Sequence, residues 1–379
     1  MRKVGIVDFC RSPISKAKKG ALAALPSLTI AEQVVNQLME RNPKVPKERF
    51  EMVVAGTAYP EGEQGLNVAR QIAIKCGFPV SVAGITVNQF CASSQQAVMM
   101  VHDSIALGKG DIGLAVGLEH MSRVPQGGYN PAFDKDLYDK NFYISMGDTA
   151  EVLAKDDEIS RADQEAFAMD SHRKALKAWE AGVFAKEVVP ISLPDGSTCA
   201  KDEFPREPNA EKIASLKPAF DAKGTVTAAT SSPLSIGVAV CLIMAEDTAK
   251  ELGLTLRATI ETTAVAGCDY ERMGLGPLPA TEKVMARSGL SISDMDVIEL
   301  NEAFASQSLS VIRRGGWTDH MSKINPYGGA LALGHPLGMS GARIIGTAIT
   351  ALEAQGGTYG LATMCVGGGQ GAATLLKRG

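Results

Sequence analysis

Val87-Asn88-Gln89-Phe90-Cys91-Ala92-Ser93-Ser94 joins two kinds of secondary structure in this sequence. Before the junction, Val82 to Phe90 is typical of a strand, and after it an apolar, helix-like segment runs from about Ser93 to Leu107. Gly108 closes that helix, and Asp111 to Gly117 has the composition of another strand. A strand, a helix and a second strand in this order indicate an α/β sheet with helical crossovers.

The same alternation extends to both ends of the chain and is interrupted in the middle. Thr29 and Glu32 have capping-box spacing and predict a helix start. Ser160 is expected to cap an amphipathic helix that ends near Trp179. Pro190 to Lys223 is polar and rich in proline, which favours a long surface loop, usually a lid or a binding loop. Strand-like runs resume at about Gly237.

A faint internal repeat links the two ends. The helix from Ser94, its glycine break and the strand that follows have a counterpart. That counterpart runs from Ser340 through a helix to about Ala354 and on to a strand from Tyr359 to Met364. Any two βα units look alike, so on this evidence duplication and coincidence both remain open.

Composition limits the classes of function. The chain has 379 residues, 45% hydrophobic and 21% charged, which suits two or three ordered domain-sized units. The net charge of −4 and the lack of basic runs argue against nucleic-acid binding. We expect no membrane span and no signal or transit peptide. Seven scattered cysteines argue for a reducing compartment, so we expect a cytoplasmic protein. Neither CxxC nor HExxH occurs, so metal ligation has no support.

Two residues at predicted helix starts are candidates for nucleophile and base. Cys91 stands where a helix N-terminus would lower its thiol pKa, and from position alone it fits a nucleophile or a buried structural cysteine. His335 lies among glycines beside Pro336, a setting typical of a fixed loop tip. A lone histidine is often structural, but His335 is the best general-base candidate in the sequence.

Two further candidates follow strand-like runs. Cys365 precedes a glycine cluster whose backbone N–H groups, Gly367 included, suit an oxyanion site, although a flexible turn is also consistent with it. A dinucleotide fingerprint at these glycines is excluded, because too few residues follow Ala372 to complete a βαβ unit. Asn301 fits a helix N-cap and, less directly, a group that orients a water or an oxyanion.

Taken together, these motifs resemble those of the thiolase family over essentially the whole chain. They are Asn88 with Cys91-Ala92-Ser93, Asn301-Glu302-Ala303-Phe304, Gly334-His335-Pro336 and Cys365-Val366-Gly367-Gly368-Gly369. Cys91-Ala92-Ser93-Ser94 and Glu119-His120-Met121 are more similar to degradative 3-ketoacyl-CoA thiolases than to acetoacetyl-CoA-forming enzymes.

The resemblance implies a fold and an assembly. The fold would have two similar βαβαβαββ halves in a five-layer αβαβα sandwich. The first part of the N-terminal half would span 1–117. A loop domain covering the CoA site, with the return to that half, would span 118–240, and the C-terminal half 241–379. It also implies a homodimer or homotetramer, and it leaves room for a complex with a multifunctional β-oxidation subunit.

The resemblance also assigns roles. Cys91 would be the nucleophile that becomes acylated, and His335 the base that also stabilises an oxyanion. Cys365 would accept and donate protons. Asn301 would hold an oxyanion water, and Gly367 would supply a backbone oxyanion donor.

Substrate contacts are also carried over from the family. Ser232 and Met146 match positions that contact CoA or substrate in the family. CoA would be a substrate, with no tightly bound cofactor.

The sequence departs from the family pattern at Thr230, Ser235 and Ile236, in the stretch that faces CoA. Three functions therefore stay under consideration. The first is thiolytic cleavage of 3-ketoacyl-CoA in fatty-acid β-oxidation, and the second is condensation of two acetyl-CoA. The third is a silent subunit that binds acyl-CoA without turning it over. Ketosynthases fit less well, because they typically carry histidine where Cys365 stands.

Overall fold

The structure is a computed structural model that describes residues 2–379. Met1, the first residue of the expected segment 1–117, lies outside the described residues. The first part of the chain alternates strands and helices: β1 (Val4–Arg11), β2 (Ser15–Lys16), α1 (Ser27–Arg41), β3 (Phe50–Gly56), α2 (Val68–Lys75), β4 (Ala83–Val87), α3 (Ser93–Ala106) and β5 (Ile112–His120).

The middle of the chain is mostly helix and loop: α4 (Lys135–Asp139), α5 (Met146–Asp156), α6 (Arg161–Glu180), β6 (Ile191–Ser192), β7 (Thr198–Cys199) and α7 (Ala210–Ala214). Alternation then resumes: β8 (Ser235–Ala245), α8 (Glu246–Glu251), β9 (Ala258–Gly267), α9 (Pro277–Ser288), β10 (Val297–Leu300), α10 (Ala305–Arg314), α11 (Ala330–Leu333), α12 (Leu337–Gln355), β11 (Tyr359–Val366) and β12 (Gln370–Arg378).

The strand pairing repeats in the two parts of the sheet. In the first part, β3 runs parallel to β5, β5 antiparallel to β8, and β8 antiparallel to β1. In the second, β10 runs parallel to β11, β11 antiparallel to β12, and β12 antiparallel to β9. A short pairing of β1 with β9 joins the two parts, and β4 extends the first beyond β3. The shared pattern favours duplication over coincidence as the origin of the repeat in the sequence.

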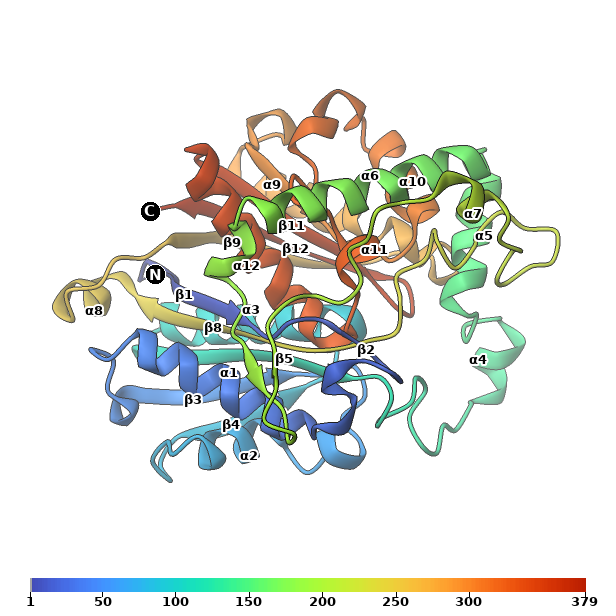
Figure 1. Cartoon of the computed structure of the whole chain (residues 1–379). Helices are drawn as coiled ribbons and strands as arrows, with labels where there is room; N and C mark the ends of the chain where they lie inside the picture. Colours follow the sequence, from blue (N-terminus) through green and yellow to red (C-terminus); the bar gives the residue numbers. More distant parts are fainter. Residues whose placement is uncertain (1) are drawn as a thin grey trace.

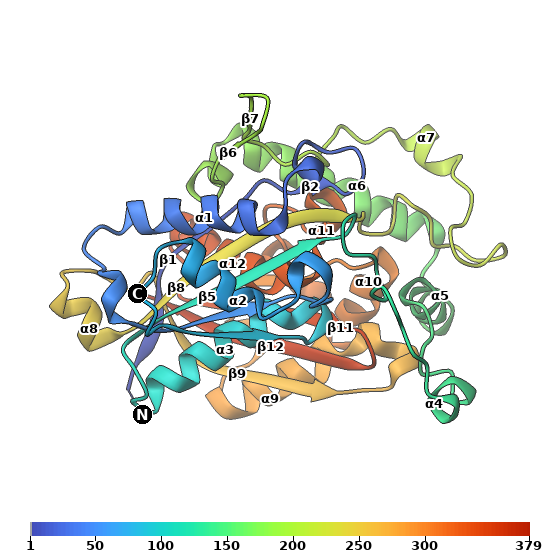
Figure 2. The same cartoon turned by 90° about the horizontal axis from the view of Figure 1, so that it is seen from below.

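Helices cover and separate the two parts of the sheet (Figure 1). α1 and α2 pack on the outer face of the first part, as the view from below shows (Figure 2). α9 and α10 cover the outer face of the second part. α3 and α12 pack on each other between the two parts, which completes the layer order αβαβα in residues 2–379. Every residue of α12 from Leu337 to Leu352 is buried, as expected for a helix covered on all sides.

Most elements expected from the sequence are present. α3 matches its predicted span, and Ser160 caps α6, where its Oγ accepts a hydrogen bond from the Asp163 N–H at 3.0 Å. α1 forms because its apolar side chains, Ile30 to Leu38, pack on the sheet. The predicted capping box of α1 is wrong, because the helix begins at Ser27 after Pro26 and has no side-chain cap. Burial, and not capping, therefore defines this helix.

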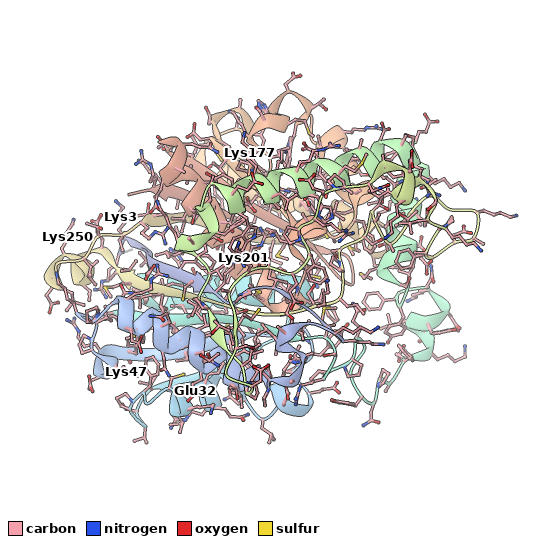
Figure 3. The ribbon with its side chains drawn as sticks, in the orientation of Figure 1. Lys3, Glu32, Lys47, Lys177, Lys201 and Lys250 are labelled. Carbon is pink, nitrogen blue, oxygen red and sulfur yellow. The ribbon has the colours of Figure 1, made fainter. Side chains whose placement is uncertain are left out.

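The middle segment packs against the body mainly through α5 and α6, while α4 lies at the margin of the molecule in both views (Figures 1 and 2). Buried Arg11 of β1 fixes the loop beyond α6, because its guanidinium contacts Asp202 at 2.8 Å and Glu187 at 3.1 Å. Charged side chains such as Glu32, Lys47 and Lys250 lie toward the outside of the molecule (Figure 3). In residues 2–379, no helix is both long enough and apolar enough to cross a membrane.

Candidate active site

The turn between β4 and α3 places Cys91 beside the middle layer. Phe90 adopts the left-handed region at φ +43°, a conformation that costs a non-glycine residue about 1–2 kcal/mol. Side chains hold the turn in place. The Phe90 N–H donates to Asn88 Oδ1 at 2.8 Å, and the Gln89 N–H donates to Ser93 Oγ at 2.9 Å. Such fixed strain is typical of functional turns, so the turn itself supports a reactive Cys91.

The environment of Cys91 keeps its thiol protonated at rest. Burial raises the pKa of Cys91 to about 12, whereas the backbone N–H groups of Gly367 and of Cys91 itself favour the thiolate. The expectation that a helix N-terminus would lower this pKa is wrong, because α3 begins at Ser93 and burial outweighs any dipole effect. Cys91 therefore needs a base to become a nucleophile.

His335, the candidate base, is held in a fixed position. It follows Gly334 (φ +105°) and precedes the Pro336 N-cap of α12. The Ser340 hydroxyl donates to the Pro336 carbonyl at 3.0 Å, so at 2.6 Å from His335 Nδ1 it acts as the acceptor. The proton then sits on Nδ1, and Nε2 carries the lone pair that can take another. Burial, with help from the Arg343 charge, lowers the pKa of His335 to about 3, so the imidazole is neutral.

Asn301 meets His335 at the end of β10. Its Nδ2 lies 3.4 Å from His335 Nε2, and its backbone N–H donates to the Thr363 carbonyl at 3.0 Å. The side chain is buried, and Oδ1 has no hydrogen-bond partner among residues 2–379. A buried, unpaired amide oxygen is where an ordered water is expected. The N-cap interpretation is wrong, because α10 begins at Ala305 after Phe304.

Cys365 lies at the end of β11, before the glycine turn. It is fully buried, and burial raises its pKa well above the usual thiol value, with smaller contributions from Cys91 and Cys268. Gly368 and Gly369 adopt φ of +78° and +81°, so this turn requires glycine. The turn presents the Gly367 N–H to Cys91, and the two thiols therefore face one site.

The two predicted substrate contacts also lie near this site. Met146 begins α5 and packs on the apolar cluster that contains Cys365. A Cβ placed on Gly367 would lie 3.6 Å from the Met146 sulfur. The Ser232 N–H donates to the Ala303 carbonyl at 2.9 Å, two residues after Asn301. Contact of either residue with CoA stays a prediction.

Sequence reasoning missed two serines that hold His335. Ser340 holds the ring, and the Ser235 hydroxyl accepts the His335 backbone N–H at 3.1 Å. Ser340 could have been found from its position in the first turn of the helix after His335. Ser235 stood out in the sequence only as a departure from the family pattern, because its contact joins residues that lie far apart in the chain.

Comparisons with known proteins cover the whole chain. The model for "Thiolase, N-terminal domain" matches residues 4–247, and that for "Thiolase, C-terminal domain" matches 254–378. The 3-ketoacyl-CoA thiolase of Idiomarina loihiensis is 46% identical and that of Vibrio vulnificus 45%, and each alignment covers 100% of both chains.

Solved structures of other proteins also match the fold of this chain over its whole length. Human mitochondrial 3-ketoacyl-CoA thiolase in complex with CoA has a TM-score of 0.92 at 32% identity, covering 100% of this chain and 98% of its own. The acetyl-CoA acetyltransferase of Bacillus anthracis has a TM-score of 0.91 at 37% identity, with 100% and 99% covered.

Proposed function

The chain belongs to the thiolase family, and from this premise we propose that it cleaves 3-ketoacyl-CoA with CoA to give acetyl-CoA and a shortened acyl-CoA. The thiolase fold expected from the sequence is confirmed, and the protein is an acyltransferase. Full-length relatives that carry the name 3-ketoacyl-CoA thiolase support the degradative reaction.

One observation carries the proposal. The Gly367 N–H lies near enough to Cys91 to favour its thiolate, the turn that carries Cys91 packs against α12, and Asn301 Nδ2 lies 3.4 Å from His335 Nε2 just before α12. A protonated thiol, a neutral imidazole and fixed backbone donors are the parts that acyl transfer through a thioester requires.

In the first half-reaction, His335 Nε2 takes the proton of Cys91, and the thiolate attacks the 3-keto carbon. The N–H groups of Cys91 and Gly367 stabilise the resulting oxyanion. The bond between C2 and C3 then breaks, and the electron pair leaves as the enolate of acetyl-CoA. Asn301, through a water, and His335 stabilise the enolate oxygen, while Cys365 donates its proton to the enolate carbon.

In the second half-reaction, the Cys365 thiolate takes the proton of incoming CoA. The CoA thiolate attacks the acyl group on Cys91 and expels the Cys91 thiolate, which regains its proton from His335. Both thiols and the imidazole thus return to their starting states. CoA is a substrate in this scheme, and Ser232 and Met146 are proposed to contact it or the acyl group.

The condensing direction is the second candidate, because the same groups run the reaction in reverse. The similarity to the acetyl-CoA acetyltransferase of Bacillus anthracis supports it. The higher identity of the 3-ketoacyl-CoA thiolases of Idiomarina loihiensis and Vibrio vulnificus favours the degradative reaction for this chain. A silent subunit is the weakest candidate, because such a protein has no use for two thiols, a neutral base and an oxyanion donor in one site.

A second copy of this chain is the proposed partner. In the described part of the chain, β4 is an edge strand paired only with β3. Apolar side chains, Ile85 on β4 and Val80 and Leu66 nearby in sequence, are exposed. Exposed strand edges of this kind are normally covered, and a homodimer would cover this one. Free thiols at every cysteine support a cytoplasmic location.

The test is CoA-dependent cleavage of acetoacetyl-CoA and of 3-ketooctanoyl-CoA by the purified protein, with Cys91→Ala as the blank. Turnover of both substrates that disappears in the variant supports degradation. Turnover of acetoacetyl-CoA alone would favour the condensing enzyme. CoA binding without turnover of either would overturn the proposal and favour the silent subunit. Copurification from cells would test for the multifunctional subunit.

A further inference from the structure

Glu119 is a buried carboxylate beside the site that the proposed reaction does not use. It lies at the end of β5 and is 1% exposed. Oε2 accepts the backbone N–H of Ala58 at 2.7 Å and that of Gly338 at 2.9 Å. Oε1 accepts Gln64 Nε2 at 2.7 Å and the Thr57 hydroxyl at 3.2 Å. Both oxygens are therefore fully engaged.

These contacts fit the ionised form of Glu119. Gln64 also donates to the Thr57 oxygen at 2.9 Å, which turns the Thr57 O–H toward the carboxylate. Each partner is then a donor, and a protonated carboxyl would place its own O–H against one of them. Burial raises the pKa of Glu119, and these hydrogen bonds oppose that rise.

The Gly338 contact crosses from the first part of the sheet to the second. Gly338 lies in the first turn of α12, where free N–H groups and the helix dipole favour a negative charge. A Cβ on Gly338 would come within 2.5 Å of the Leu118 carbonyl oxygen and of the Thr57 Cα. The helix start is thus pressed against β5 with no room for a side chain.

The same helix turn carries the group that holds His335. Ser340, which fixes His335 Nδ1, stands two residues after Gly338. We propose that Glu119 is a positioning residue, which holds the first turn of α12 and thereby keeps His335 in place to serve Cys91. The inference rests on the proposed roles of Cys91 and His335.

A second carboxylate anchors the other end of the His335 loop. Glu302 accepts the Leu331 N–H at 3.2 Å and the Ser171 hydroxyl at 2.7 Å, and Ser171 Oγ accepts the Gly329 N–H at 2.9 Å. Glu302 belongs to the same part of the chain as His335, so it shapes the loop from within. Glu119 instead ties this loop to the part that carries Cys91.

A positioning role and a purely electrostatic role of Glu119 predict opposite effects of Glu119→Gln on the reactivity of Cys91. The Glu119 charge also raises the pKa of Cys91. If the charge alone mattered, Glu119→Gln would make Cys91 more reactive. If Glu119 positions His335, the same substitution leaves the base misplaced and makes Cys91 less reactive, and a displacement of about 1 Å can cost about 10²-fold in rate.

The experiment measures alkylation of Cys91 by iodoacetamide, read from the mass of the Cys91 peptide, and thiolysis of acetoacetyl-CoA. We expect Glu119→Gln to slow alkylation about tenfold and to lower kcat by about 10²-fold with KM little changed. Glu119→Asp, which keeps the charge, should recover part of both rates. It also serves as the test if Glu119→Gln does not fold.

Asp8→Asn is the matched control. Asp8 is a buried carboxylate that accepts the Phe9 N–H and Asn42 Nδ2, each at 2.8 Å, and pairs with Arg41 at 2.8 Å and Arg257 at 3.5 Å. Arg257 also pairs with Glu353, in the last turn of α12, at the opposite end of that helix from His335. Asp8→Asn should lower the melting temperature but leave both rates within about twofold. Faster alkylation in Glu119→Gln, or rates equal to those of Asp8→Asn, would overturn the proposal. Alkylation needs no substrate, so this result is independent of whether 3-ketoacyl-CoA is the substrate.

Discussion

The unit built on α3 and the unit built on α12 have the same construction. Each helix ends at a glycine in the left-handed region, Gly108 at φ +74° and Gly356 at φ +69°, and leads into a strand, β5 or β11. The two helices pack side by side in the middle layer, where the Ala342 N–H donates to Ser94 Oγ at 2.8 Å. The bodies of the two units are thus equivalent.

The ends of the two units differ, and the candidate catalytic residues lie at these ends. The α3 unit begins with Cys91 in a strained turn and ends with Glu119, a carboxylate that binds backbone N–H groups. The α12 unit begins with His335 and ends with Cys365. One unit thus carries the proposed nucleophile, and the other carries the proposed base and the second thiol. In these two similarly built units, the candidate catalytic residues lie at the ends of helices and strands.

Cys91→Ala removes the proposed nucleophile of the α3 unit and should have the largest effect on activity. We expect thiolysis to fall by at least ~10⁴-fold, because no other group can carry the acyl intermediate. Steady-state assays with acetoacetyl-CoA measure the loss. Cys76→Ala, which removes a buried thiol at the end of α2, is the control and should retain activity. Equal activity in both variants would remove Cys91 from the reaction.

His335→Ala removes the contribution of the α12 unit to the same step. Loss of a general base lowers rates by about 10²–10⁴-fold, and we expect about 10³-fold here. Alkylation of Cys91 by iodoacetamide should slow as well, because the thiol then has no partner to take its proton. If alkylation kept the wild-type rate, Cys91 would not depend on His335.

Asn301→Ala is expected to have a smaller effect than either catalytic substitution. Its amide is proposed to act through a water, and removal of one oxyanion contact costs about 10²-fold in kcat. The alkylation rate of Cys91 should change little, since Asn301 acts at the cleavage of the C2–C3 bond and not at the deprotonation of Cys91. Comparing kcat with alkylation in this variant and in His335→Ala tests that division of roles.

The pH dependence of the free enzyme compares the two units directly. The pKa of Cys91 is raised to about 12 and that of His335 is lowered to about 3, so neither group changes its charge between pH 6 and 9. Transfer of the Cys91 proton to neutral His335 exchanges no proton with solvent, so alkylation that depends on His335 should be level across this range. An inflection near 6.5 would show that His335 titrates normally.

Gly108→Ala and Gly356→Ala test whether the two glycine breaks are equivalent. Each position has open space for a Cβ but a positive φ, so each substitution should destabilise the fold by about 1 kcal/mol with activity unchanged. Denaturant unfolding measures the stability of each variant, and thiolysis assays measure its activity. A much larger cost at one position would show that the two breaks differ in function.

The fold was largely predictable because apolar periodicity and glycine punctuation are local in sequence. The spans of α3 and α6 illustrate this. The capping box at Thr29 and the cap at Asn301 were wrong, because tertiary packing overrode a local pattern. Burial, equally non-local, reversed the expected direction of the Cys91 pKa.

The site could be predicted only in part. Motifs identified Cys91, His335, Asn301, Cys365 and Gly367. In the structure, Cys91 lies beside Gly367 and Cys365, and Asn301 lies beside His335. The residues that hold them, Ser235 and Glu119, contact partners 100 and 219 positions away in the chain. No local pattern marks such pairs, because only the packing of one part of the molecule on the other creates them.

The most direct test of acyl transfer through Cys91 is the mass of the Cys91 peptide after the enzyme is mixed with 3-ketooctanoyl-CoA without added CoA. Acyl transfer through Cys91 predicts a hexanoyl adduct on this residue, release of acetyl-CoA in matching amount, and loss of the adduct when CoA is added. An adduct on Cys365, or acetyl-CoA released with Cys91 unmodified throughout, would contradict it.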